Sequence, residues 1–409
     1  MPGLKAGFGR LATLGELFDL LNDHLPELEV ERTSIRDAAG RVLAKEVVAD
    51  IDVPHFAKAA MDGYAVVASD TFTASDASPT PLEVIASVMP GDRSEVEVTS
   101  GRCVEIGTGA PMPEGANAVV MVEYTEVGHD RETLVRKGVA PGENIVPVGS
   151  DIAKGTAVLG AGTRLEPRHL GVLAAIGVSD VELVRKPRVA LLSTGPEIVE
   201  AGGELAPGQI FDINTHTLRA ALVDDGAEVI ELGIVPDVLD QLKSALERGL
   251  DAADLVMLSG GSSLGGGDLV TEAFSGLGEL LIHGVAVKPG KPVVVGRTKH
   301  KEATKLMVGL PGYPMSALSD YYIFIQPFLR RAMGTPSLTR HIQAELSRKH
   351  PSTVGRYEFL PVQLEKGTAI PLTKGSSSIS ALAYADGFVE IDENTEVVEA
   401  GQTVNVRLF

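Results

Sequence analysis

The chain has 409 residues, of which 55 are acidic and 36 are basic, giving a formal net charge of −19 at pH 7. This charge disfavours nucleic acids and anionic membranes as ligands, because both require basic surface patches. Hydrophobic residues make up 44% of the chain and 45 residues are glycine, a composition typical of a globular protein of several domains with many turns. Cys103 is the single cysteine, which excludes an intrachain disulfide and a cysteine-based zinc site.

The N-terminal stretch has no continuous apolar core of the kind found in signal peptides. The longest apolar run, YYIFIQPFL, is too short to span a bilayer and is interrupted by Gln326 and Pro327. We therefore expect a soluble cytoplasmic protein without a targeting segment.

The first half of the chain changes character twice. Residues 11–50 carry a helical pattern that begins with LATLGELFDLLND and continues through TSIRDAAGRVLAKEV. Residues 51–146 contain short β-type runs separated by Gly, Pro and Asp clusters, which predicts a small barrel or sandwich. Residues 147–186 form a mixed segment with a helical patch at EPRHLGVLAAIG.

From residue 187 the sequence alternates between strand and helix patterns. RVALLST, EVIELGIV, DLVMLSGG and KLMVGLPG read as strands, and the segments between them include several amphipathic helices. Alternation of this kind predicts a mostly parallel sheet with helices on both faces, and ligands of such sheets bind at the carboxyl ends of the strands. The tripeptides STG (193–195), SGG (259–261) and LPG (310–312) fall at those ends. After about residue 335, short β runs return and predict a small terminal β domain.

The loop LSGGSSLGGGD (258–268) has two interpretations. Backbone N–H groups of a glycine-rich turn before a helix can bind phosphate oxygens, whereas a flexible surface loop would have the same composition. A P-loop is excluded, since the loop has no lysine. Asp268 is accordingly either a helix cap or a Mg²⁺ ligand acting with substrate phosphates.

Other charged residues lie at predicted strand ends and turns. Glu197 and Asp237 follow two strands, as helix-dipole partners or as ligands of a metal or substrate. Lys288 and Lys291 flank the turn KPGKP, which is either a solvated hairpin tip or an oxyanion site. Asp62, followed by Gly63, reads most simply as the turn of a hairpin.

Taken in order, these segments resemble the molybdopterin molybdenumtransferase family, which includes bacterial MoeA and the E domain of gephyrin. The motifs run along nearly the whole chain and each is modest alone, but the ordered set is highly specific. They are AMDGYAV (60–66), GTGAPMPEGANAVVMVE (107–123), GENI (142–145), STGPEI (193–198), FDINTHTL (211–218), LSGGSSLGGGD (258–268), VKPGKP (287–292), LPGYPMSAL (310–318), GRYEF (355–359) and GSSSIS (375–380).

The resemblance implies a multidomain α/β plus β fold with a central three-layer α/β molybdopterin-binding domain. Flanking small β-barrel domains and an elongated N-terminal α+β segment complete this fold. We expect a linker and dimerisation domain at 1–50 plus 147–186, a small β domain at 51–146, the α/β domain at 187–334 and a C-terminal β-barrel at 335–409.

The resemblance also implies an activity and partners. Adenylylated molybdopterin and molybdate would enter, and molybdenum cofactor and AMP would leave, with Mg²⁺ assisting cleavage of the pyrophosphate. The site would lie at the interface of a homodimer. A molybdopterin-adenylyltransferase and molybdoenzyme apoproteins are compatible as further partners, whereas nucleic acid and membrane are not expected.

Matching positions carry the family's site roles onto this chain. Catalytic roles fall on Asp62, Glu197, Asp237, Asp268 and Lys288, with Asp237 and Asp268 as the Mg²⁺ ligands. Molybdate-binding roles fall on Lys288, Lys291, Arg356, Ser376 and Ser377. Substrate-binding roles fall on Thr108, Thr194, Gly195, Ser259, Gly260, Gly261, Ser262, Ser263, Gly265, Pro311, Gly312 and Pro314.

Five positions depart from the family pattern, in that Val146, Ser150, Pro196, Thr271 and Gly284 replace residues that are commonly charged. These losses leave alternatives open: a non-catalytic paralogue that binds the cofactor or a partner protein, and a tungstate-inserting variant. An adenylyltransferase is less favoured, because the flanking β domains are additional to that α/β unit.

Overall fold

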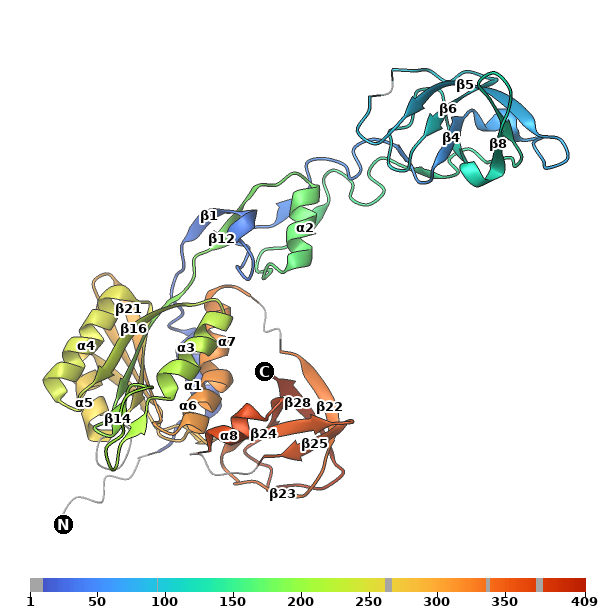
Figure 1. The fold of residues 1–409 in the computed structure, drawn as a ribbon. Coiled ribbons are helices and arrows are strands. Elements are labelled where there is room, and N and C mark those ends of the chain that lie inside the picture. Colours follow the sequence, from blue (N-terminus) through green and yellow to red (C-terminus); the bar gives the residue numbers. More distant parts are fainter. Residues whose placement is uncertain (1–9, 94, 262–266, 336–338, 373–377) are drawn as a thin grey trace, which may run out of the picture.

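The computed structural model describes residues 10–93, 95–261, 267–335, 339–372 and 378–409, except for the side chains of Gly267 and Asp268. The molecule is elongated, with one β domain at the far end of a slender two-stranded connection and an α/β domain beside a second β domain at the other end (Figure 1). No helix within these described ranges is both long enough and apolar enough to cross a bilayer.

The α/β domain is built on a six-stranded sheet of order β16-β13-β17-β21-β20-β18. Its first four strands are parallel, and β20 runs antiparallel to both of its neighbours, β21 and β18, so the prediction of a mostly parallel sheet is confirmed. The strands are β13 (Arg188–Thr194), β16 (Glu228–Val235), β17 (Leu255–Gly260), β18 (Glu279–His283), β20 (Val294–His300) and β21 (Ala303–Leu310).

Helices cover both faces of this sheet, as the alternating sequence pattern predicts (Figure 1). One face packs against α4 (Leu239–Ala252) and α5 (Gly267–Leu277). The other packs against α1 (Leu14–Asn22), α3 (Asn214–Asp224), α6 (Pro314–Asp320) and α7 (Gln326–Ala332), the last two joined by a π-helical turn at Tyr321–Ile325. Each face buries a continuous apolar cluster, which is the main source of the domain's stability.

The C-terminal β domain is a closed sheet of order β24-β25-β22-β28-β26, in which β26 pairs back onto β24. Its strands are β22 (His341–Leu346), β24 (Tyr357–Glu365), β25 (Thr368–Pro371), β26 (Gly387–Ile391) and β28 (Thr403–Leu408), with the short helix α8 (Ile379–Ala383) and the pair β23 (His350–Pro351) and β27 (Val397–Val398) beside them. Strand β19 (Val287–Lys288) leaves the α/β domain and pairs with β24, so the predicted terminal β domain is joined to its neighbour by backbone hydrogen bonds.

The distal domain contains a six-stranded sheet of order β7-β4-β6-β5-β9-β8. Its strands are β4 (Gly63–Val66), β5 (Thr80–Val88), β6 (Arg102–Ile106), β7 (Ala118–Met121), β8 (Thr125–Val127) and β9 (Glu132–Val135). Asp62 and Gly63 do not form the hairpin tip that the dipeptide suggested, because Gly63 lies in the strand, paired with both Ile106 and Met121. A Cβ on Gly63 would lie 1.9 Å from the Val120 carbonyl oxygen, so close strand packing explains the glycine.

The connection between the two ends is mostly strand and loop. It consists of the pairs β1 (Val30–Ser34) with β12 (Asp180–Val184), β2 (Val47–Val48) with β11 (Ala157–Leu159), and β3 (Lys58–Ala59) with β10 (Ile145–Val146), together with α2 (Pro167–Ala175). The prediction of helix throughout residues 11–50 was therefore wrong beyond α1, whereas the helical patch near residue 170 is confirmed as α2. Tertiary pairing outweighed local propensity here, because the TSIRD segment begins in the strand β1 that pairs with β12.

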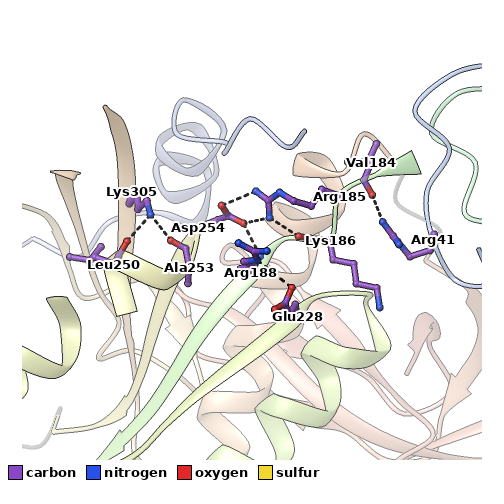
Figure 2. Close-up of polar contacts among 10 residues, drawn as sticks. All are labelled: Arg41, Val184, Arg185, Lys186, Arg188, Glu228, Leu250, Ala253, Asp254 and Lys305. Carbon is purple, nitrogen blue, oxygen red and sulfur yellow. Dashed lines mark hydrogen bonds and ion pairs between the residues drawn. The ribbon is translucent and has the colours of Figure 1, made fainter. Parts of the chain in front are cut away.

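A buried ion pair ties this connection to the α/β domain (Figure 2). Both terminal nitrogens of Arg185 donate to the Asp254 carboxylate at 3.0 Å, and the Arg188 backbone N–H donates to the same carboxylate at 2.7 Å. The side chains of Arg185 and Asp254 are only 17% and 18% exposed. Because two fork-like bonds hold a planar guanidinium, this contact fixes the direction in which β12 enters β13.

Replacing Asp254 by Ala should destabilise the α/β domain by about 2 kcal/mol, because a largely buried guanidinium and one backbone N–H lose their acceptor. The measurement is denaturant unfolding followed in the isolated full-length chain. Glu228→Ala is the matched control, since its exposed pair with Arg188 should be worth under about 0.5 kcal/mol. Equal effects of the two substitutions would contradict the role assigned to Asp254.

Candidate active site

Three strand ends of the α/β sheet meet where the sequence predicted them to meet. The parallel register places Thr194 opposite Gly260, and Ser259 opposite Leu310. The backbones approach so closely that a Cβ on Gly260 would lie 2.0 Å from the Thr194 carbonyl oxygen. On its other side, Gly260 lies in contact with Gly312, whose own Cβ would lie 3.6 Å from the Gly260 Cα. The tripeptides STG, SGG and LPG thus form one continuous edge.

Asp237 lies at this edge, just beyond β16, and is partly buried. The Thr194 hydroxyl lies within hydrogen-bonding distance of the Val235 carbonyl oxygen, at 2.9 Å, and of the Asp237 carboxylate. Thr194 is 1% exposed and contacts the Asp237 carboxylate, so we expect its hydroxyl to orient Asp237. The sequence had suggested a direct contact between Thr194 and substrate.

Glu197 folds back over the same edge. It is exposed, and its carboxylate lies so near Gly195 that a Cβ there would be 2.8 Å from Oε2. Gly195 has a φ of +154° and is buried, so a side chain at this position would displace the glutamate. The close approach explains why a glycine precedes the Pro-Glu pair.

The chemistry of these donors fits Mg²⁺. Carboxylate oxygens and hydroxyls are the ligands that this ion prefers, and it usually takes one or two carboxylates while keeping water and substrate phosphates. Asp237 supplies one carboxylate, and Asp268 belongs to the start of α5 at the neighbouring strand end, although its side chain lies outside the described residues. Across the described ranges, no group of three His, Cys, Asp or Glu side chains is arranged to hold a metal alone.

A cavity of about 530 Å³ lies between the α/β domain and the C-terminal barrel. Its lining includes both turn lysines and the loop that follows LPG; the principal residues are Lys288, Lys291, Tyr313, Met315, His350 and Glu358. The alternative interpretation of KPGKP as a solvated hairpin tip is wrong, because β19 is paired with β24 and the turn forms a wall of this cavity. Gly290 has a φ of +110°, which favours glycine, and lies directly against the buried Asp320 carboxyl.

Lys288 forms an ion pair with Glu358. Its ammonium donates to Glu358 Oε2 at 3.1 Å and lies 3.1 Å from Oε1. The Glu358 carboxylate also accepts from His350 Nε2 at 2.9 Å and from the Ser352 hydroxyl at 2.8 Å. Burial acts to raise the pKa of Glu358, but these three donors outweigh it and the pKa lies below its usual value, so the carboxylate is ionised.

Asp62 and Thr108 form a separate pair in the distal domain. Asp62 Oδ1 accepts from the Thr108 backbone N–H at 2.6 Å and from its hydroxyl at 2.7 Å. These two bonds lower the pKa of Asp62, which is fully exposed. The distal domain lies at the opposite end of the molecule from the α/β domain, so this pair cannot reach the strand edge within one chain (Figure 1).

Not every predicted residue joins these groups. Arg356 is partly buried immediately before β24, but it is not among the described residues that line the cavity. Pro311 is buried at the LPG turn, and Pro314 opens α6 immediately beyond it. Ser262, Ser263, Gly265, Ser376 and Ser377 lie outside the described residues.

The structure adds residues that motif spacing did not nominate. Asn214, at the start of α3, donates to the Ser259 hydroxyl at 2.6 Å and to the Gly312 carbonyl at 2.9 Å, and so links two of the strand ends. Its Oδ1 is buried and has no hydrogen-bond partner in the described part of the chain. Asn214 stands within FDINTHTL and Glu358 within GRYEF, but the burial that distinguishes both residues is seen only in the folded chain.

The departures from the family pattern have partial structural explanations. Gly284 donates its backbone N–H to the Val293 carbonyl and accepts from the Ala12 N–H, and its φ of +95° disfavours any side chain at this position. Val146 pairs with Lys58 at the base of the distal domain, and Ser150 is exposed. Pro196 is exposed beside Glu197. Nothing in the structure explains the threonine at position 271.

Known proteins resemble the chain over nearly its whole length. The MoeA N-terminal region (domains I and II) matches residues 12–177, a probable molybdopterin binding domain matches 190–331, and the MoeA C-terminal region (domain IV) matches 343–409. The central α/β sheet with its glycine-lined edge is therefore of the molybdopterin-binding class.

Relatives and solved structures agree with these matches. A molybdopterin molybdenumtransferase of Haemophilus influenzae is 32% identical over 98% of this chain and 99% of its own. Molybdopterin molybdenumtransferase 2 of Mycobacterium tuberculosis is 37% identical over 91% and 93%. A crystal structure of the molybdopterin biosynthesis MoeA protein from Pyrococcus horikoshii is 38% identical, with a TM-score of 0.85 over 98% and 99% of the two chains. The chain belongs to the MoeA family of molybdopterin molybdenumtransferases.

Thr108→Val should raise the pKa of Asp62 toward its ordinary value, because one of the two bonds that favour the ionised carboxylate is lost. The backbone bond remains, so part of the lowering should persist. An NMR titration of the side-chain carboxyl carbon measures this. Asp392, whose pKa is lowered by Asn394, is the internal control and should not move. An unchanged Asp62 titration would show that the Thr108 hydroxyl does not act on it.

Proposed function

We propose that the chain inserts molybdate into adenylylated molybdopterin in a Mg²⁺-dependent reaction that releases AMP and molybdenum cofactor. The activity is that of a molybdopterin molybdenumtransferase, an enzyme of molybdenum cofactor biosynthesis. The observation that carries the proposal is that a single loop contributes both to the strand edge and to the wall of the lysine cavity. Residues 310–312 form part of the glycine-lined strand edge, and Tyr313, Met315 and Ser316 line the lysine cavity.

This arrangement gives each anion its own place. The strand edge brings backbone and hydroxyl groups to the pyrophosphate of the adenylylated substrate, with Asp237 and Asp268 beside it as metal ligands. Bound Mg²⁺ would neutralise charge on the leaving phosphate. Lys288 and Lys291 line the adjacent cavity and supply positive charge to molybdate. Water adds across the P–O–P link as it is cut, so AMP departs with one phosphate and the molybdopterin keeps the other.

The position of the distal Asp62–Thr108 pair supports a second part of the proposal, which concerns how the site is completed. In one chain it lies far from the strand edge (Figure 1). We therefore propose a homodimer in which the distal domain of one protomer covers the α/β edge of its partner. The slender connection, fixed at its base by Arg185 and Asp254, holds the distal domain away from its own edge.

Reconstitution tests the function directly. Purified protein with adenylylated molybdopterin, Mg²⁺ and molybdate should release AMP, and absence of release at micromolar molybdate would refute the proposal. Asp268→Ala should abolish release because it removes a metal ligand. Asp240→Ala is the matched control, since this aspartate lies in the first turn of α4 and should leave turnover unchanged.

Mixing two inactive variants tests the shared site. Asp62→Ala and Asp237→Ala should each be inactive as homodimers. When co-expressed, half of the dimers are mixed and each mixed dimer has one intact site, so activity should return to about a quarter of the original. The control pairs Asp62→Ala with the Asp62→Ala/Asp237→Ala double variant, in which neither site regains Asp62. Failure of the first mixture to recover would refute a site shared between two protomers.

A further inference from the structure

Glu358 is a buried carboxylate inside a cavity whose other charged walls are lysines, and no role in the reaction has been given to it. Its side chain is 6% exposed, and it contacts the ammonium of Lys288, which is 38% exposed. An anion-binding cavity gains nothing by Coulomb attraction from a negative charge in its wall. The carboxylate therefore needs another explanation.

We infer that Glu358 is a positioning residue for Lys288, and through it for the oxyanion that enters the cavity. This inference rests on the proposed function, since it assigns a task within the same site. A lysine ammonium has three N–H groups. Glu358 occupies at most two of them, which leaves at least one directed toward the cavity.

The carboxylate is itself held in place from two sides. His350, which is 8% exposed, donates to Oε1, and Ser352 donates to Oε2. Both come from the segment that leads into β24, whereas Lys288 comes from the α/β domain. Three donors from two domains converge on one side chain. The contact therefore defines a single ammonium position, which a lysine with four rotatable bonds does not adopt unaided.

The strand register produces the contact. Lys288 is the direct partner of Glu358 in the parallel pair β19–β24, and the Tyr357 backbone N–H donates to the Ala286 carbonyl at 2.9 Å. The ammonium is thus fixed at its root by backbone pairing and at its tip by the carboxylate. Positioned donors of this kind bind an anion without reorganising first, which is how preorganised sites gain strength.

The first test is molybdate binding. Glu358→Gln keeps the shape of the side chain, but its amide nitrogen cannot accept from any of the three donors. Isothermal titration with sodium molybdate should show affinity reduced about tenfold, and the KM for molybdate should rise in parallel with little change in kcat. Unchanged or tighter binding would overturn the inference, since tighter binding would mean that Glu358 acts only as a repelling charge.

A double-mutant cycle separates positioning from a merely structural role. In a Lys288→Met background, Glu358→Gln should change molybdate affinity or KM by less than about twofold, because its effect passes through the ammonium. A tenfold effect in that background would refute the inference. Glu399→Gln is the matched control, because this glutamate pairs with Lys349 on the exposed surface of the same barrel.

A third measurement does not depend on activity. The rate at which acetic anhydride modifies Lys288, followed by peptide mass spectrometry, should rise several-fold in Glu358→Gln and by less in Ser352→Ala, because a nearby carboxylate favours the charged, unreactive ammonium. Ser352→Ala retains the carboxylate and serves if the glutamine variant fails to fold. An unchanged rate in both variants contradicts the positioning role even if the wild-type chain is active. An inactive wild type with the expected rate changes would instead refute only the proposed function.

Discussion

The pairing of β19 with β24 is the constraint on which the proposed oxyanion site depends. Two residues, Val287 and Lys288, lie between the α/β strands β18 and β20 in the chain and pair with β24 of the C-terminal barrel. That short pairing brings a lysine of one domain opposite a glutamate of another and closes a cavity between them. Without it, the lysine turn would be a solvated tip and the barrel would carry no part of the site.

The strand edge depends on a different constraint, which is the absence of side chains. Gly260 approaches the Thr194 carbonyl so closely that even a methyl group would overlap it. Because three strand ends are compressed in this way, their backbone groups and the Thr194 hydroxyl can act together. The same glycines that looked like a flexible loop in the sequence are, at positions 260 and 261, part of a tightly packed edge.

Sequence patterns predicted the elements whose burial is periodic. β13, β16, β17 and the helices between them follow from alternating apolar runs, and the adjacency of STG, SGG and LPG follows from parallel strand ends. The region after α1 was misread, because apolar spacing in TSIRDAAGRVL fits a helix while pairing with β12 makes part of it a strand. Pairing between segments some 150 residues apart leaves no local signal.

Candidate site residues were predictable where a motif presents them, but their contacts were not. Asp237 could be nominated from its place after a strand, whereas its bond to Thr194 requires knowing which strand lies beside β16. Glu358 was overlooked next to Arg356, because a glutamate in a strand has no distinctive spacing. Its importance comes from burial and from donors on β19 and on the segment entering β24, which only the folded chain brings together.

The negative net charge of the chain explains why local contacts around the lysines are needed for anion binding. A chain with a net charge of −19 repels the dianions that it is proposed to bind, so attraction has to be created over a few ångströms. Within that range, the orientation of each cation matters more than the number of cations, since interactions between exposed charges fade over a Debye length of about 8 Å at physiological salt. Holding Lys288 between a paired backbone and a clamped carboxylate is a physical means of concentrating positive potential at one point. An acidic protein can in this way bind an oxyanion in its cavity while its outer surface remains unattractive to polyanions.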